Sequence, residues 1–138
     1  SVNLLTIQAL TKGKISVFGG SQVRPNIHID DIANVYLHFI DHPEVTGIYN
    51  AGFENISILE IAKLVAKHLP TEITVTESYD PRSYRVNSDK LLATGFEPSK
   101  TVENAILEII ALYKSGQLKD EDHFHNLRWM QRTVLIAK

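Results

Sequence analysis

Two arginines in this chain stand in sequence contexts that suit the binding of an anion. Arg24 precedes segment 26–29, whose alternation of apolar and polar residues is typical of a strand, and Arg82 lies in segment 79–87, where Asp-Pro and Ser favour an irregular surface connection. A guanidinium presents a planar fork of N–H donors that matches paired phosphate oxygens, so two of them could clamp one diphosphate. From the residues alone, two solvated arginines are the commoner interpretation, because arginine is usually a surface residue.

The histidines are the next candidates for chemistry. His123 and His125 could form a metal site with Asp122. Two histidines without a third ligand at helical spacing, and without an H-E-x-x-H motif, are weak evidence, so we predict no metal site and a solvated tail. We interpret His28, on the expected strand beside Arg24, as a core or pocket-edge imidazole rather than a general base.

The elements that position these residues can be read from periodicity and from Gly and Pro stops. Helices are expected over 2–12, 31–41, 57–69, 87–94 and 101–115, and strands over 15–18, 26–29, 47–52 and 73–76. Strands separated by helices predict an α/β fold. We expect one domain over residues 1–116 and a tail, 117–138, that is helical.

Capping residues and apolar stripes support the main helices. Asp30 and Asp31 supply N-cap chemistry to the second helix, and Ser57 with Glu60 forms an S-x-x-E capping box for the third. Two helices carry the stripe of a buried helix. Their stripes are Ile32, Val35, Tyr36, Phe39 and Ile40 in one, and Val102, Ala105, Ile106, Ile109 and Tyr113 in the other.

Composition excludes several classes of protein. A chain of 138 residues with 43% hydrophobic residues can bury one core. Its net charge of −2 and its lack of dense Lys/Arg patches argue against a nucleic-acid partner. The longest apolar runs fall well below the roughly 20 residues of a membrane span, so we expect no membrane partner. Zero cysteines exclude thiol chemistry, and with no signal-peptide pattern we expect a cytoplasmic location.

The segment from Arg24 to Ala33 resembles the R-x-x-I-H-V-x-D-x-A segment of extended short-chain dehydrogenases, the NAD-dependent nucleotide-sugar epimerase and dehydratase family. In that family the arginine contacts the substrate diphosphate. Segment 80–90 is similar to the family's D-x-R-x-Y-x-x-D-x-S-K, which Arg82 and Tyr84 match together with Lys90. Asn87 and Asp89 replace the commoner Asp and Ser of that motif.

Further matches follow in the family's order from about residue 1 to 113. Ser16-Val17-Phe18-Gly19 resembles the family's strand beside the nucleotide base, and Tyr49-Asn50-Ala51-Gly52 resembles its Y-N-x-G motif. Ser57 to Ile61 resembles its S-x-x-E-L/I motif, and Gly95 to Pro98 resembles its L-G-F/W-x-P motif. Each motif is unspecific by itself, but their order and spacing together are specific.

The resemblance implies the C-terminal, substrate-binding portion of such an enzyme, a small domain of short strands and packed helices without the Rossmann half. Its ligand would be a nucleoside-diphosphate sugar, with Arg24 and Arg82 on the phosphates, Tyr84 beside them, and Val17, Phe18 and Asn26 near the base. NAD or NADP would bind the missing N-terminal half, which is the partner this portion needs. A homo-oligomer is also compatible with the resemblance.

The residues of the hydride chemistry do not occur in this chain. The family uses a glycine-rich turn for NAD and a Tyr-x-x-x-Lys pair. No G-x-x-G-x-x-G is present, and none of the five tyrosines is followed by a lysine four positions later. We therefore predict no catalytic and no cofactor-binding residue in this chain. The intact enzyme would oxidise the sugar transiently, typically at C4.

Other interpretations stay open. The chain could be a stand-alone nucleotide-binding or interaction module without catalysis, or a structural α/β domain whose pocket binds nothing. It could also be part of a longer protein. In that case part of the apolar surface of helices 31–41, 57–69 and 101–115 would face the missing half, and we expect apolar area to be exposed.

Overall fold

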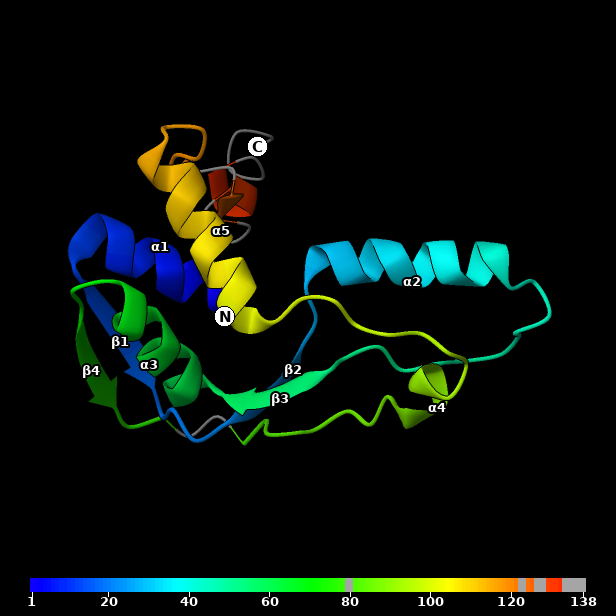
Figure 1. Ribbon diagram of the computed structural model, residues 1–138. Coiled ribbons are helices and arrows are strands. Elements are labelled where there is room, and N and C mark those ends of the chain that lie inside the picture. Colours follow the sequence, from blue (N-terminus) through cyan, green and yellow to red (C-terminus); the bar gives the residue numbers. More distant parts are fainter. Residues whose placement is uncertain (79–80, 122–123, 126–128, 133–138) are drawn as a thin grey trace.

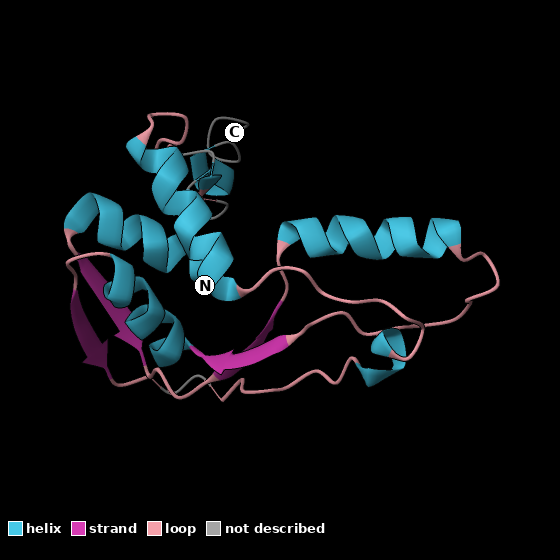
Figure 2. Ribbon diagram, in the orientation of Figure 1, coloured by secondary structure: helices cyan, strands magenta, loops and turns pink. Residues whose placement is uncertain are grey.

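The computed structural model describes residues 1–78, 81–121, 124–125 and 129–132. Its helices are α1 (Val2–Lys12), α2 (Ile29–Asp41), α3 (Ile58–His68), α4 (Asp89–Leu92) and α5 (Val102–Lys114), and its strands are β1 (Lys14–Phe18), β2 (Val23–Asn26), β3 (Glu54–Ser57) and β4 (Glu72–Thr76). Figure 1 shows their order along the chain, and Figure 2 separates helices, strands and loops. The predicted α/β class is confirmed. None of the described helices is long and apolar enough to cross a membrane.

The core lies where α1, α3 and α5 pack against one another and where α1 and α3 cover β1. Ile15, Val17, Ile61, Val65 and Ile106 are almost completely buried there. Burying a side chain of this size stabilises the fold by about 1.5–3 kcal/mol. The three helices and the first strand therefore form the stable body from which the rest of the chain extends.

Each of the two small sheets has two strands. β1 pairs in parallel with β4, with Lys14 opposite Glu72, and β2 pairs antiparallel with β3, with Val23 opposite Ser57. The turn from β1 to β2 uses Gly20 at a φ of 93°, where a Cβ would come within 3.1 Å of a Val17 methyl group. This turn delivers β2, and Arg24 within it, directly from the core strand.

The capping box of α3 is confirmed, because the Ser57 hydroxyl accepts the Glu60 N–H and the Glu60 carboxylate accepts the Ser57 N–H. A second box, of Thr101 and Asn104, starts α5 and was not predicted. Ile110 adds to the buried face of α5 beyond the predicted stripe.

The predicted strand over 26–29 is wrong. β2 ends at Asn26, and α2 begins at Ile29. His28, and not Asp30 or Asp31, is the N-cap, because its Nδ1 accepts the Asp30 N–H at 3.2 Å. His28 is 7% exposed and lines a cavity, as expected of a core or pocket-edge imidazole.

The predicted strand over 47–52 is also wrong. Residues 48–52 have no regular secondary structure, and the strand that pairs with β2 follows them as β3. Ile48 is 89% exposed, and no described strand lies beside it to complete a ladder.

α2 does not bury the predicted stripe against the core of this chain. Tyr36 and Ile40 are 69% and 71% exposed, while Ile32, Val35 and Phe39 are partly buried. Figure 1 shows α2 set apart from the body that α1, α3 and α5 form. Apolar area of this helix is therefore exposed.

The structure describes residues 117–121, 124–125 and 129–132 of the tail. Residues 129–132 are helical, and Phe124 and Trp129 are about half exposed. Asp122 and His123, which were considered as metal ligands, lie outside the described residues, as do residues 126–128 and 133–138.

Candidate functional site

Arg24 lies on β2 and holds the loop that carries Arg82. Its Nη1 donates to the Val23 carbonyl at 3.0 Å and to the Arg82 carbonyl through a short hydrogen bond. Its guanidinium carbon lies 5.3 Å from the centre of the Tyr84 ring, within the range of a cation–π contact. Two segments separated by 58 residues therefore meet at this arginine.

Hydrogen bonds of backbone and side chains hold the same loop against β2. The Tyr84 N–H donates to the Val23 carbonyl at 3.2 Å, and the Val23 N–H donates to the Ser83 hydroxyl at 3.1 Å. From the other side, the Asn55 side chain of β3 donates to the Val86 carbonyl and accepts the Val86 N–H. The loop from Arg82 to Val86 is thus held against the β2–β3 pair, and not free in solvent.

Asn26 ends β2 beside this junction. Its amide donates to the Arg24 carbonyl at 2.8 Å and to the Glu54 carbonyl at 3.2 Å. Both donors of the side chain amide have backbone acceptors, so Asn26 braces the end of the strand that carries Arg24.

Val17 and Phe18 are placed differently from each other. The Val17 side chain is 1% exposed in the core, so only its backbone could approach a ligand. Phe18 is 64% exposed at the end of β1, where an aromatic ring could stack on a base. The structure brings Arg24, Tyr84, Asn26 and the backbone of Arg82 together, and it leaves Val17 inside the core.

Asp31 has a role that the sequence did not reveal. It is completely buried and accepts hydrogen bonds from the Ser99 N–H at 2.9 Å, the Ser99 hydroxyl at 2.8 Å and the Lys100 N–H at 3.1 Å. Burial alone would raise the pKa of this carboxyl, but the hydrogen bonds from Ser99 and Lys100 outweigh burial and lower it. Asp31 therefore stays ionised and ties the start of α2 to the segment before α5.

A second tie between α2 and α5 runs through His28. Its Nε2 lies 3.1 Å from Glu108, which also accepts from the Lys100 ammonium at 2.8 Å. That ammonium lowers the pKa of Glu108, and the same bond raises the pKa of Lys100. The start of α2 is therefore fixed by the side chains of His28, Asp31 and Glu108.

The group His28, Asp30 and Glu108 has ligand atoms within 4.8 Å of one another, but it does not fit a metal ion. Since Nδ1 accepts the Asp30 N–H, the ring proton lies on Nε2 and is donated to Glu108, which leaves no nitrogen lone pair for a metal. The Lys100 ammonium already supplies the positive charge at this place.

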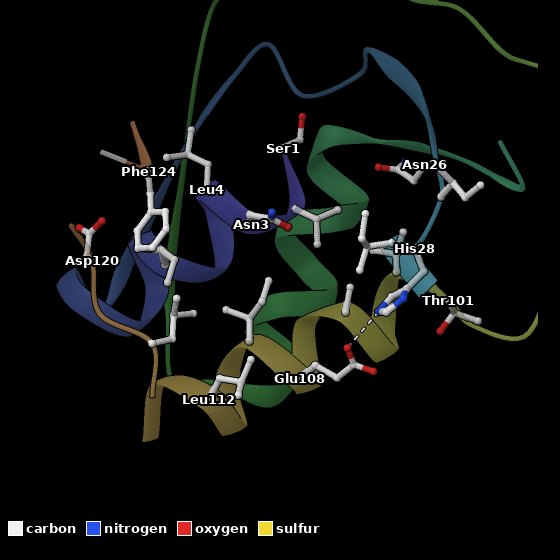
Figure 3. Close-up of a pocket in the computed structure, with 18 of the residues that line it drawn as sticks. Ser1, Asn3, Leu4, Asn26, His28, Thr101, Glu108, Leu112, Asp120 and Phe124 are labelled. Atoms are coloured by element: carbon white, nitrogen blue, oxygen red, sulfur yellow. Dashed lines mark hydrogen bonds and ion pairs between the residues drawn. The ribbon is translucent and has the colours of Figure 1, made fainter. Parts of the chain in front are cut away.

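A cavity of about 810 Å³ opens between α1, α5 and the start of α2 (Figure 3). Its wall is largely apolar and includes Leu4 and Leu112, with the His28–Glu108 pair at one side and Phe124 at the other. Of the predicted ligand-binding residues, it contains Asn26 and neither of the two arginines. The arginine junction and this cavity are therefore separate features of the surface.

No family model matches the sequence. Three solved structures illustrate the fold likeness. The dTDP-glucose 4,6-dehydratase of Bacillus anthracis in complex with NAD matches with a TM-score of 0.69 and 23% identity, over 83% of this chain and 38% of that chain. The UDP-glucose 4-epimerase of Thermotoga maritima with UDP-glucose matches with a TM-score of 0.69 and 19% identity, over 85% of this chain and 40% of that chain. A monomeric L-threonine 3-dehydrogenase from a metagenome matches with a TM-score of 0.66 and 20% identity, over 80% of this chain and 39% of that chain.

The chain thus has the fold of the C-terminal portion of extended short-chain dehydrogenases, as the motifs predicted. It spans about two fifths of the length of each of these proteins. Two of them are named for nucleotide-sugar substrates and one for an amino acid. The fold therefore does not determine which substrate is bound, and the side chains at the site must do so.

Proposed function

We propose that this chain is the nucleoside-diphosphate-sugar-binding portion of an NAD- or NADP-dependent epimerase or dehydratase. The observation that carries the proposal is the junction of Arg24 with the loop of Arg82 and Tyr84. A diphosphate site built from two arginines requires the two segments to converge, and they do so without any other polypeptide.

The residues of this chain would bind and orient, and would not react. Arg24 and Arg82 would neutralise the diphosphate through charge-assisted hydrogen bonds, and Tyr84 would keep the Arg24 guanidinium in place. The exposed ring of Phe18 is available for stacking with the base. Holding the diphosphate fixes where the sugar lies, which is the positioning that such an enzyme needs.

The glycine turn after β1 does not fit a dinucleotide. The turn at Gly19 and Gly20 leads into β2 and not into a helix, so no helix N-terminus is there to receive a pyrophosphate. When bound to the other half of the enzyme, NAD or NADP would supply hydride transfer. We assign no step of that chemistry to this chain.

Calorimetric titration tests the proposal directly. The chain is titrated with UDP, dTDP, ADP and GDP, and with the matching nucleosides, which lack the diphosphate. The proposal predicts saturable binding of at least one diphosphate and none of its nucleoside. Arg24→Ala and Arg82→Ala should each weaken binding about tenfold to a hundredfold, because a charge-assisted bond contributes roughly 1.5–3 kcal/mol.

Arg132→Ala, which alters an arginine of the tail outside this junction, is the matched control and should bind as the parent chain does. If both junction variants bind as tightly as the parent chain, the arginines have another role and the proposal fails.

A stand-alone nucleotide-binding module is the second candidate. It is favoured by the fact that the junction forms within this chain alone. The full-length product of the gene that encodes this chain separates the two. Binding of NAD or NADP by that product supports the enzyme, and nucleotide binding without any dinucleotide binding supports the module.

A further inference from the structure

Gln22 is a buried polar side chain in the turn between β1 and β2, and the proposed function gives it no role so far. Only 8% of this residue is exposed. Its Oε1 accepts the Gly20 N–H at 2.7 Å, and its Nε2 donates to the Phe18 carbonyl at 3.0 Å. One side-chain amide thus joins the end of β1 to the turn that follows it.

The backbone of the turn is shaped to receive this amide. Gly19 and Gly20 have φ values of 74° and 93°, which favour glycine. A Cβ on Gly19 would lie 2.6 Å from the Gln22 Nε2, so the amide packs directly against the backbone of Gly19. The start of α3 holds the turn from outside, since the Ile58 N–H donates to the Gln22 carbonyl at 3.1 Å and the Leu59 N–H to the Gly20 carbonyl at 2.9 Å. The amide is therefore a built-in part of the turn.

This turn connects the two parts of the candidate nucleotide site (Figure 1). Phe18, which is 64% exposed, precedes the turn, and Arg24 follows it on β2. A nucleoside diphosphate has its base at one end and its phosphates at the other. A ring that stacks on the base and an arginine that binds the phosphates must therefore stand at a fixed separation, which residues 19–23 determine.

The arginine end of the site does not depend on the turn. β2 is paired with β3 along its whole length, and Arg24 is bonded to the loop of Arg82 beyond the turn. Phe18, in contrast, is the last residue of β1, and its carbonyl accepts the Gln22 amide. Loss of that amide would therefore loosen the Phe18 end of the site and leave the arginine end in place.

We propose that Gln22 is a positioning residue for base recognition, which holds Phe18 at the separation from Arg24 that the base and the diphosphate of one nucleotide require. This rests on the proposed function and deepens it. Gln22 acts through the turn and through Phe18, and it does not itself contact the ligand. Without its amide the site would still bind a diphosphate, but the base would contribute little to the affinity.

Paired titrations with nucleotides and with inorganic pyrophosphate test this inference, because pyrophosphate has no base and can occupy only the arginine end. Gln22→Met keeps the length of the side chain and removes both hydrogen bonds. Gln8→Met is the matched control, because the Gln8 Oε1 also accepts a backbone N–H of β1, that of Ser16 at 3.4 Å, but in the middle of the strand.

Each variant and the parent chain are titrated by calorimetry with pyrophosphate and with UDP, dTDP, ADP and GDP. Circular dichroism verifies that each variant is folded, and Gln22→Ala takes the place of Gln22→Met if the methionine variant does not fold.

We expect Gln22→Met to weaken the binding of the preferred nucleoside diphosphate about fivefold to a hundredfold, the range that stacking of one base contributes. Its affinity for pyrophosphate should change less than about twofold, because the arginine end stays in place. Gln8→Met should leave both affinities unchanged. In a Phe18→Ala background, which lacks the stacking ring, Gln22→Met should have no further effect on nucleotide affinity.

Equal loss of both affinities in Gln22→Met, or loss of neither, overturns the inference and leaves the proposed function standing. Independent, additive effects of Phe18→Ala and Gln22→Met overturn it as well, and so does a parent chain that binds pyrophosphate as tightly as the nucleotides. A parent chain that binds neither nucleotide nor pyrophosphate overturns the proposed function and this inference with it, so the two failures give different results.

Discussion

Replacement of Asp31 by asparagine tests how the start of α2 is held. The buried carboxylate accepts three hydrogen bonds from Ser99 and Lys100. Asparagine turns one acceptor oxygen into an amide donor, so at least one N–H that now donates to Asp31 loses its partner. A hydrogen bond to a charged group contributes about 1.5–3 kcal/mol, and an unsatisfied buried group costs about 1–3 kcal/mol. We expect Asp31→Asn to lower the free energy of unfolding by about 2–4 kcal/mol, a large share of the 5–15 kcal/mol typical of a domain.

Urea unfolding followed by circular dichroism at pH 7 measures this loss. Asp30→Asn is the matched control, because the Asp30 side chain is 56% exposed and its contact with Lys100 is 3.7 Å long. Its loss should stay below about 1 kcal/mol. Equal losses from the two variants would refute the reasoning.

The pH dependence of the same pair gives a second readout. Because the folded-state pKa of Asp31 is lowered, its contribution to stability is present above the unfolded-state pKa of about 4 and is lost as the pH falls through the folded-state value. The difference in stability between the parent chain and Asp31→Asn should therefore shrink below about pH 4. A difference that grows in acid would contradict the assignment.

Three further outcomes are expected. Thr101→Ala removes the N-cap of α5 and should cost about 1 kcal/mol in urea unfolding, whereas Thr74→Ala, on exposed β4, should cost less than half of that. The 138-residue chain should show no saturable NAD binding at micromolar concentration by calorimetry, and clear saturation would contradict our interpretation of its sequence. The double variant Tyr36→Ser, Ile40→Ser should self-associate less than the parent chain in analytical ultracentrifugation and be equally stable, because both side chains are exposed. If the parent chain self-associates and the double variant has the same sedimentation profile, the exposed face of α2 is not the surface of self-association.

Features that depend on neighbouring residues could be predicted from the sequence. The capping box joins Ser57 and Glu60, which are three positions apart, and the helix end at Gly13 could be predicted because glycine favours the left-handed conformation that it adopts there, at a φ of 63°. His28 as an N-cap was missed because histidine is not among the residues preferred there. The tie between Asp31 and Ser99 spans 68 residues and leaves no local signal.

The errors at α2 and at residues 47–52 have one cause. Periodicity shows that a face or a strand needs a partner, but it does not say where that partner is. For Tyr36, Ile40 and Ile48 the partner is not among the described residues. The meeting of Arg24 with the Arg82 loop was likewise accessible only through the family resemblance, since the spacing of two arginines implies no contact.

The most direct test of the central claim replaces each arginine by lysine, which keeps the charge and removes the fork. Diphosphate titrations of Arg24→Lys and Arg82→Lys are compared with the parent chain and with Arg132→Lys. The account predicts that each junction variant weakens binding about tenfold to a hundredfold, while the tail variant changes nothing. Binding that survives both lysine substitutions unchanged, or a parent chain that binds no nucleoside diphosphate, would contradict it.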